Sequence, residues 1–153
     1  MSSEQDMIRL TDRLRRLCSR REYCSSDILK KAAAALEGNT EGAQKILDIL
    51  VSEKYVDDLR YASAYAREKA MISGWGEVKI RYMLSSKRID RTLIDRALAE
   101  IDSDKADSRL QKLLENKART LKADPQIRLK LLRFALGRGY QYDDVIRVLQ
   151  DIL

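Results

Sequence analysis

The stretch KILDIL, residues 45–50, decides the fold because its pattern returns twice further along the chain. It reappears as RALAEI at residues 96–101 and as RVLQDI at residues 147–152, each time shifted by 51 residues. An earlier apolar set obeys the same shift, in the order Leu29, Ala32, Ala33, then Ile80, Met83, Leu84, then Leu131, Phe134, Ala135. Similarity at one long period is typical of tandem repeats, whose units bury their apolar faces partly against one another.

Within each repeat the apolar residues recur at steps of three and four. Leu10, Leu14 and Leu17 form one such stripe, which lies on one face of a helix and not on one face of a strand. Six glycines and one proline leave few positions for the turns of a many-stranded β fold. The sequence therefore predicts an all-α chain of three tandem three-helix repeats. We expect an elongated body, which a small rotation from repeat to repeat can curve.

Turn and cap residues divide the chain into three units. The expected domains are residues 1–56, whose first residues are frayed, residues 57–102, and residues 103–153. Carboxylates, hydroxyls and glycines mark the helix ends inside them. They are Ser25, Ser26 and Asp27, Gly38 to Thr40, Asp57 and Asp58, Gly74 to Gly76, Asp90, Asp124 with Pro125 as the first helical residue, and Gly137 with Gly139.

The chain is basic, with a net charge of +6, and residues 109–138 hold nine basic side chains against only Glu115 and Asp124. Such an excess favours a polyanion or an acidic protein groove as partner, although a solubilising coat has the same composition. On the first interpretation, the residues that contact the partner are Lys79, Arg81, Lys87 and Arg88 in the second unit, and Arg128, Lys130, Arg133 and Arg138 in the third.

Several kinds of chemistry find no support. The chain has no histidine, which removes the usual general base and most zinc sites. Cys18 and Cys24 are not spaced as a metal or redox pair, and we expect both as reduced, at least partly buried thiols. The pairs Asp57-Asp58 and Asp143-Asp144 start helices, where carboxylates are usually caps. We therefore expect no enzyme activity, no cofactor and no metal.

The N-terminal residues and the lengths of the apolar runs indicate the cellular location of the protein. The first residues are polar and acidic, unlike a signal peptide, and no apolar run is long enough to cross a bilayer. We expect a cytoplasmic monomer with no membrane contact.

Gly74-Trp75-Gly76 resembles a nucleotide-binding loop only superficially. No strand precedes it, and Lys79 stands where a third glycine would fall. It is better interpreted as a turn between helices. Trp75 itself either packs beside this turn or stacks on a nucleic-acid base.

At residues 55–62, YVDDLRYA, the chain resembles the RecX family, bacterial regulators of the RecA recombinase. The likeness continues through the Gly74 to Gly76 turn, the helix with Lys79, Ile80, Arg81 and Leu84, and the turn at residues 87–89. It ends in FALGRGY at residues 134–140 and the acidic Asp144 that follows. Near the N-terminus, SRREYCS at residues 19–25 is similar to another family stretch. The positions that match the family motifs are Asp57, Asp58, Arg60, Tyr61, Gly74, Gly76, Ile80, Leu84, Gly139, Tyr140 and Asp144.

The match covers about residues 10 to 150 and departs from the family at turns. Lys54 and Arg88 stand where the family has glycine, Glu77 where it has proline, and Tyr23-Cys24 where histidine is frequent. The resemblance implies three tandem three-helix repeats that bind RecA along the groove of its filament on single-stranded DNA. It also implies modulation, usually inhibition, of recombinase ATPase, strand exchange and co-protease activity, within DNA repair and the SOS response.

Two other functional classes stay open on the residues alone. A nucleic-acid-binding module that acts without RecA would bind bare DNA tightly and with a steep salt dependence. A helical scaffold for another acidic protein would affect neither DNA nor RecA.

Overall fold

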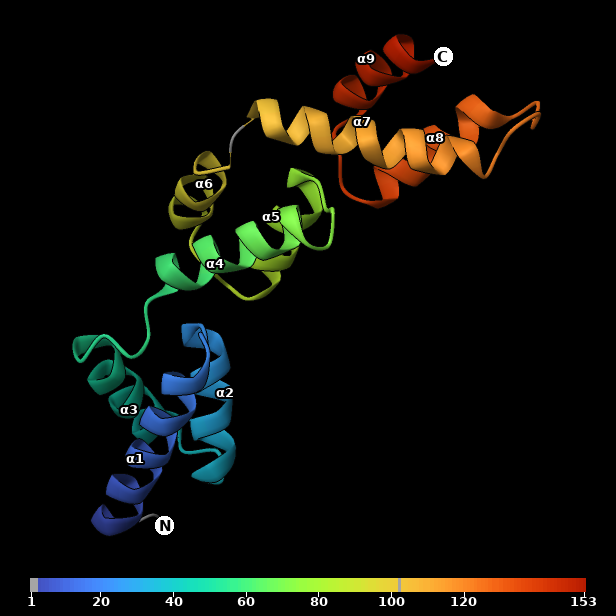
Figure 1. Cartoon of the computed structure of the whole chain (residues 1–153). Coiled ribbons are helices and arrows are strands. Elements are labelled where there is room, and N and C mark those ends of the chain that lie inside the picture. Colours follow the sequence, from blue (N-terminus) through green and yellow to red (C-terminus); the bar gives the residue numbers. More distant parts are fainter. Residues whose placement is uncertain (1–2, 102) are drawn as a thin grey trace.

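The computed structural model describes residues 3–101 and 103–153, and helices are the only regular secondary structure in those two ranges (Figure 1). The first unit contains α1 (Glu4–Arg20), α2 (Ser25–Ala35) and α3 (Thr40–Ser52). The second contains α4 (Asp58–Met71), α5 (Glu77–Ser86) and α6 (Arg91–Ala99). The third contains α7 (Ser103–Arg119), α8 (Ile127–Gly137) and α9 (Tyr142–Ile152). The prediction of an all-α chain built from three-helix repeats is confirmed.

The period found in the sequence is a period of the structure. The third helices of the three units begin at residues 40, 91 and 142, which are 51 residues apart in both steps. Ile46, Ala97 and Val148, which this shift relates, are all buried, with at most 5% of their surface exposed. The repeated apolar stripe is therefore the side of each third helix that faces its own core.

Each unit has its own apolar core, and each helix packs mainly against the other two of its unit. Leu14 and Leu50 lie in the first core, Ile80 and Leu84 in the second, and the last core collects Leu110, Leu114, Leu131 and Leu149. Three small cores in a row give the elongated body of Figure 1, with the chain ends at opposite extremes.

Several helices begin where the capping residues predict. The Asp57 Oδ1 accepts a hydrogen bond from the Arg60 N–H at 3.0 Å, and the Asn39 Oδ1 accepts one from the Gly42 N–H at 3.0 Å. Gly76 is the N-cap residue of α5. These bonds satisfy backbone donors that have no partner inside the helix.

Three expected caps are wrong in detail. The residue before α2 is Cys24, and the Ser26 hydroxyl donates to the Lys87 carbonyl of the second unit instead of capping its own helix. Asp90 precedes α6 but makes no side-chain cap bond. Pro125 precedes the helix start at Ile127, because Asp124 accepts a hydrogen bond from the Gln126 N–H and closes a separate turn first.

Two turns keep a left-handed backbone although the family glycine is absent. Lys54 has φ +64° and Arg88 has φ +60°, a region that costs a residue with a Cβ of the order of 1–2 kcal/mol. The replacement of glycine thus changes the strain of these turns and leaves their geometry in place.

Residues 1 and 2, at the N-terminus that was expected to be frayed, and residue 102, at an expected boundary, fall outside the described ranges. Within those ranges, no helix combines the length and the apolar character that crossing a membrane requires.

Candidate functional site

The four basic residues predicted as contacts in the second unit differ in whether their charged groups already interact with other residues of the chain. Arg81 donates to Asp95 at 2.7 Å and lies 3.5 Å from Glu77, so its charge is compensated on its own surface. The Lys79 ammonium lies 4.3 Å from the centre of the Trp75 ring. Lys87 bonds to Asp27 of the first unit at 2.8 Å. Arg88 is exposed, and no salt bridge in the described part of the chain includes it.

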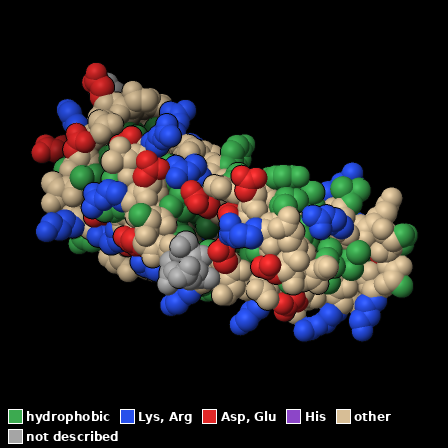
Figure 2. Space-filling view, turned by 90° about the horizontal axis from the view of Figure 1, so that it is seen from above, with side chains coloured by type: hydrophobic (Ala, Val, Ile, Leu, Met, Phe, Trp, Pro, Cys, Tyr) green, Lys and Arg blue, Asp and Glu red, His purple; other side chains and the backbone are tan. Residues whose placement is uncertain are grey.

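The third unit presents a more open basic surface. Arg128 and Arg133 on α8 are exposed and form no salt bridge among the residues described. Lys130 is paired with Asp124 at 2.6 Å, and the Arg138 guanidinium donates to the Ser73 carbonyl of the second unit at 3.2 Å. In Figure 2, Lys and Arg side chains gather toward the end of the molecule that the third unit forms.

Exposed apolar side chains lie beside these basic residues on α5 and α8, the second helices of the second and third units. Val78 and Tyr82 on α5 are 50% and 71% exposed, and Leu129 and Leu136 on α8 are also exposed. The shift of 51 residues relates Val78 to Leu129 and places Tyr82 at the position of Arg133. The outer faces of α5 and α8 are therefore mixed apolar and basic surfaces, a composition suited to contact with a protein.

The family motif at the start of α4 builds the joint between the first and second units. The Asp58 Oδ1 accepts a hydrogen bond from the Ser25 N–H at 2.7 Å. Arg60 donates to Glu22 at 2.6 Å and to the carbonyls of Lys54 and Tyr55 at 3.1 and 3.2 Å. The motif thus holds the turn after α1 and the start of α2 against the second unit.

An ion pair and a buried thiol complete this first joint. Burial raises the pKa of Asp27, but hydrogen bonds from Lys87 and Cys24 outweigh it, so the pKa of this carboxyl is lowered. The same bond raises the pKa of Lys87. Cys24 is fully buried and its side chain lies in the apolar core of the second unit, so burial raises the pKa of its thiol. Both cysteines are free thiols, as expected.

The glycine and tyrosine motifs build the equivalent joint between the second and third units. The Gly76 N–H donates to the Arg138 carbonyl at 2.8 Å, and the Val78 N–H donates to the Gly139 carbonyl at 2.9 Å. The Tyr140 hydroxyl donates to the Gly74 carbonyl at 3.1 Å. The turn before α5 therefore docks directly on the turn after α8.

Glycine is required on both sides of this second joint. A Cβ on Gly76 would lie 2.5 Å from the Gly139 backbone, and one on Gly139 would lie 2.3 Å from the Lys79 Cβ. Gly139 also has φ +96°. Two backbones approach so closely here that any side chain would separate them.

The remaining motif residues are structural. Ile80 and Leu84 are buried in the second core, and Tyr61 stacks on Tyr65 with ring centres 6.0 Å apart. Asp144 accepts a hydrogen bond from Arg147 at 3.1 Å.

Trp75 packs in the way that the first of its two interpretations predicts. Its ring meets the edge of Tyr65 at 6.4 Å, is flanked by Lys69 and Lys79, and lies half-buried against the second core. It also lines a cavity of 210 Å³ between the second and third units, together with Tyr140 and Arg109.

Neither aspartate pair forms part of a metal-binding group. Across the described residues, no three potential ligands among histidine, cysteine, aspartate and glutamate come together. Asp57 and Asp58 each accept a hydrogen bond from a backbone N–H group, and Asp143 and Asp144 lie in the first turn of α9. Asp57 caps α4 and Asp58 joins the first two units, whereas neither Asp143 nor Asp144 makes the side-chain cap bond expected of it at the start of α9.

Three-helix units joined in a row, with basic residues on their outer faces, define an all-α helical-repeat protein. Family models for the second and third three-helix domains of RecX match residues 57–98 and 105–149. The chain belongs to the RecX family of regulatory proteins. RecX proteins are regulators and not enzymes, and the resemblance found in the sequence is confirmed.

Relatives cover the chain to different extents. The regulatory protein RecX of Vibrio campbellii is 33% identical over 131 residues, which span 84% of this chain and 82% of that protein. That of Clostridium tetani is 31% identical over 72% of this chain, and the match spans only 52% of the clostridial protein. The chain thus spans about half the length of this relative.

The fold agrees with solved structures. The crystal structure of RecX from Lactobacillus salivarius matches with a TM-score of 0.84 at 19% identity and covers 97% of both chains. Another crystal structure of a regulatory protein RecX matches with a TM-score of 0.82 over 94% of this chain.

Proposed function

We propose that this chain binds the RecA recombinase and the groove of the RecA filament on single-stranded DNA. Bound there, it modulates ATP hydrolysis, strand exchange and co-protease activity, with inhibition as the expected direction. Two findings support this function: the chain belongs to the RecX family, and its sequence carries the motifs by which it resembles these regulators of RecA.

The observation that carries the proposal is the repeated outer face of the second helices. α5 and α8 offer equivalent surfaces in successive units, with Val78 and Tyr82 on one and Leu129, Arg133 and Leu136 on the other. A filament is itself a repeat of one protomer. Successive units can therefore meet successive protomers, and many weak contacts add up through high effective concentration.

The eight predicted contact residues contribute unequally under this proposal. Arg88, Arg128 and Arg133 carry the charge contacts, because they are exposed and no acidic partner within the described ranges neutralises them. Lys87 and Arg138 act mainly by holding the units in line, through Asp27 and the Ser73 carbonyl.

The test is the rate of RecA ATP hydrolysis on single-stranded DNA with substoichiometric amounts of the chain added. We expect the rate to fall, and we expect substitution of Arg88, Arg128 and Arg133 by Gln to weaken this effect. The matched control replaces Lys45, Arg91 and Lys105 by Gln, which removes the same charge from exposed positions on α3, α6 and α7. An unchanged hydrolysis rate at every concentration of the wild-type chain would sink the proposal.

A second candidate is nucleic-acid binding without RecA, favoured by the basic surface of α8. It predicts that bare DNA is bound as tightly as the filament. It also predicts a steep salt dependence. For single-stranded DNA, the logarithm of the binding constant plotted against the logarithm of the salt concentration should have a slope of roughly −0.7 for each phosphate contacted.

A further inference from the structure

Helix α1 carries a row of four arginines on one face. Arg9, Arg13, Arg16 and Arg20 follow the spacing i, i+4, i+7, i+11, which keeps them within an arc of about 60° at ~100° per residue. Along the axis the row extends roughly 16.5 Å, at a rise of ~1.5 Å per residue. All four side chains are exposed, and none takes part in a salt bridge within the described residues.

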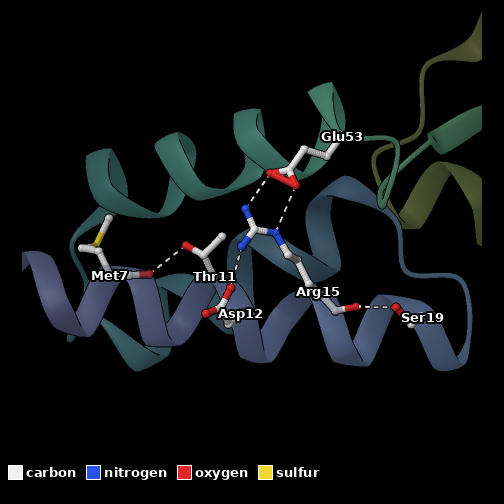
Figure 3. Close-up of polar contacts among 6 residues, drawn as sticks. All are labelled: Met7, Thr11, Asp12, Arg15, Ser19 and Glu53. Atoms are coloured by element: carbon white, nitrogen blue, oxygen red, sulfur yellow. Dashed lines mark hydrogen bonds and ion pairs between the residues drawn. The ribbon is translucent and has the colours of Figure 1, made fainter.

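The fifth arginine in the middle of this helix shows the contrast. Arg15 lies about 120° around the helix from the row. Figure 3 shows its guanidinium between two carboxylates: it donates to Glu53 at 2.6 and 3.1 Å and to Asp12 at 2.6 Å. Arg15 therefore fastens α1 to the end of α3, while the four arginines of the row are left for a partner outside the chain.

A groove of 610 Å³ runs beside the row, between α1 and the end of α2. Three carboxylates line it, and two of them have other partners. Asp6 accepts a hydrogen bond from the Ser3 N–H at the N-cap, and Asp12 is held by Arg15. Glu37 is the third. Three arginines of the row, Arg9, Arg13 and Arg16, line the groove. Glu37 is the one lining carboxylate that has no hydrogen bond or ion pair in the described part of the chain, so the side of the groove formed by α1 is basic.

The positive region continues past the end of the helix. The Arg21 guanidinium lies 4.4 Å from the centre of the Tyr23 ring, and the Lys31 ammonium lies 5.5 Å from it. Both cations are exposed, and neither forms a salt bridge in the part of the chain that the structure describes.

We infer that the arginine row of α1 is a second binding surface, separate from α5 and α8, for the phosphate backbone of a nucleic-acid strand. A guanidinium group can donate two parallel hydrogen bonds to two oxygens of one phosphate. The four arginines follow one another at intervals of ~4.5–6 Å along the helix axis, which suits a linear polyanion. Among the exposed residues that line the groove beside the row, only Ala35 is apolar, whereas an acidic protein partner would normally need an apolar centre of contact. This inference does not rest on the proposed action on RecA, since its readout is the binding of bare nucleic acid.

The test replaces Arg9, Arg13, Arg16 and Arg20 by Gln and measures the fluorescence anisotropy of a labelled 20-mer of dT and of a 20-base-pair duplex, without RecA, over a series of salt concentrations. We expect affinity to fall by about tenfold or more at low salt. The slope of log K against log salt concentration should become shallower by ~3 for the single strand. A larger change on the duplex would assign the surface to double-stranded nucleic acid.

The matched control carries Lys45, Arg91, Arg96 and Lys105 replaced by Gln, which changes the net charge equally at exposed positions on other helices. Its affinity should change by less than about threefold, through long-range electrostatics alone. Helicity by circular dichroism confirms that each variant is folded. If four substitutions unfold α1, the pair Arg13→Gln and Arg16→Gln should give about half of the slope change.

Equal DNA affinity of the row variant and the control variant would overturn the inference. So would loss of binding to a poly-glutamate peptide with DNA binding retained, because that result assigns the row to an acidic protein.

Discussion

Replacing Gly139 by Ala tests whether the contact of two glycine turns sets the shape of the molecule. The new Cβ would lie 2.3 Å from the Lys79 Cβ and 2.7 Å from the Lys79 backbone nitrogen. Overpacking of this kind costs about 1–3 kcal/mol, and a Cβ at φ +96° adds about 1–2 kcal/mol. The closed joint should therefore lose about 2–5 kcal/mol.

The joint itself provides a comparable amount. Four hydrogen bonds cross it: Gly76 to Arg138, Val78 to Gly139, Arg138 to Ser73, and Tyr140 to Gly74. At about 1 kcal/mol each they contribute ~4 kcal/mol. Since the second and third units have separate apolar cores, the joint should open while both units stay folded.

Trp75, the single tryptophan, makes this opening measurable. It is adjacent to Gly76 and is covered by Lys79, the residue that the new Cβ would displace. We expect a red-shifted emission, stronger quenching by iodide, a larger radius of gyration in X-ray scattering, and unchanged helicity. The control is Gly38→Ala, which has a similar φ of +89° but open space around its Cβ. Emission and scattering equal to those of the Gly38 variant would refute the reasoning.

Three further outcomes follow from the turns and from the first joint. Lys54→Gly should raise the free energy of unfolding by about 0.5–1 kcal/mol, measured in urea, because it removes the left-handed strain at φ +64°. Asp27→Asn should speed labelling of the Cys24 thiol at pH 8 by up to about fivefold, because a half-exposed ion pair to Lys87 contributes ~1 kcal/mol at most. The stability that Asp27 provides relative to Asn should be complete at pH 6. It should vanish as the pH falls below the ordinary pKa of 3.8 and through the lowered pKa of the folded protein, because protonation removes the charge. Urea titrations of both proteins at pH 6 and below that lowered pKa measure the difference.

Local pattern was enough to predict the units. Apolar spacing places Ile46, Ala97 and Val148 on core faces, and Asp57 can cap α4 because a cap bond spans only three residues. Interactions of this range are encoded in neighbouring residues. Where a competing partner was near, as for Asp124 and Pro125, the helix start moved by two residues.

Contacts between units could not be predicted in this way. Lys87 and Arg138 have the composition of a partner-binding surface, yet both reach back to the preceding unit. Nothing in their local sequence distinguishes them from Arg88 or Arg133, because the pairing depends on how one unit sits on the next. The row from Arg9 to Arg20 can be detected from its spacing. The sequence could not show that no described carboxylate forms a salt bridge with it, because that depends on Arg15, which binds Asp12 and Glu53.

Binding of the chain to one labelled oligonucleotide, measured with and without a RecA coat under the same salt conditions, tests the proposed function most directly. If the repeated faces of α5 and α8 grip successive protomers, the coated strand should be bound at least about tenfold more tightly than the bare one. Equal affinity for the two, or tighter binding to the bare strand, would contradict the action on the filament.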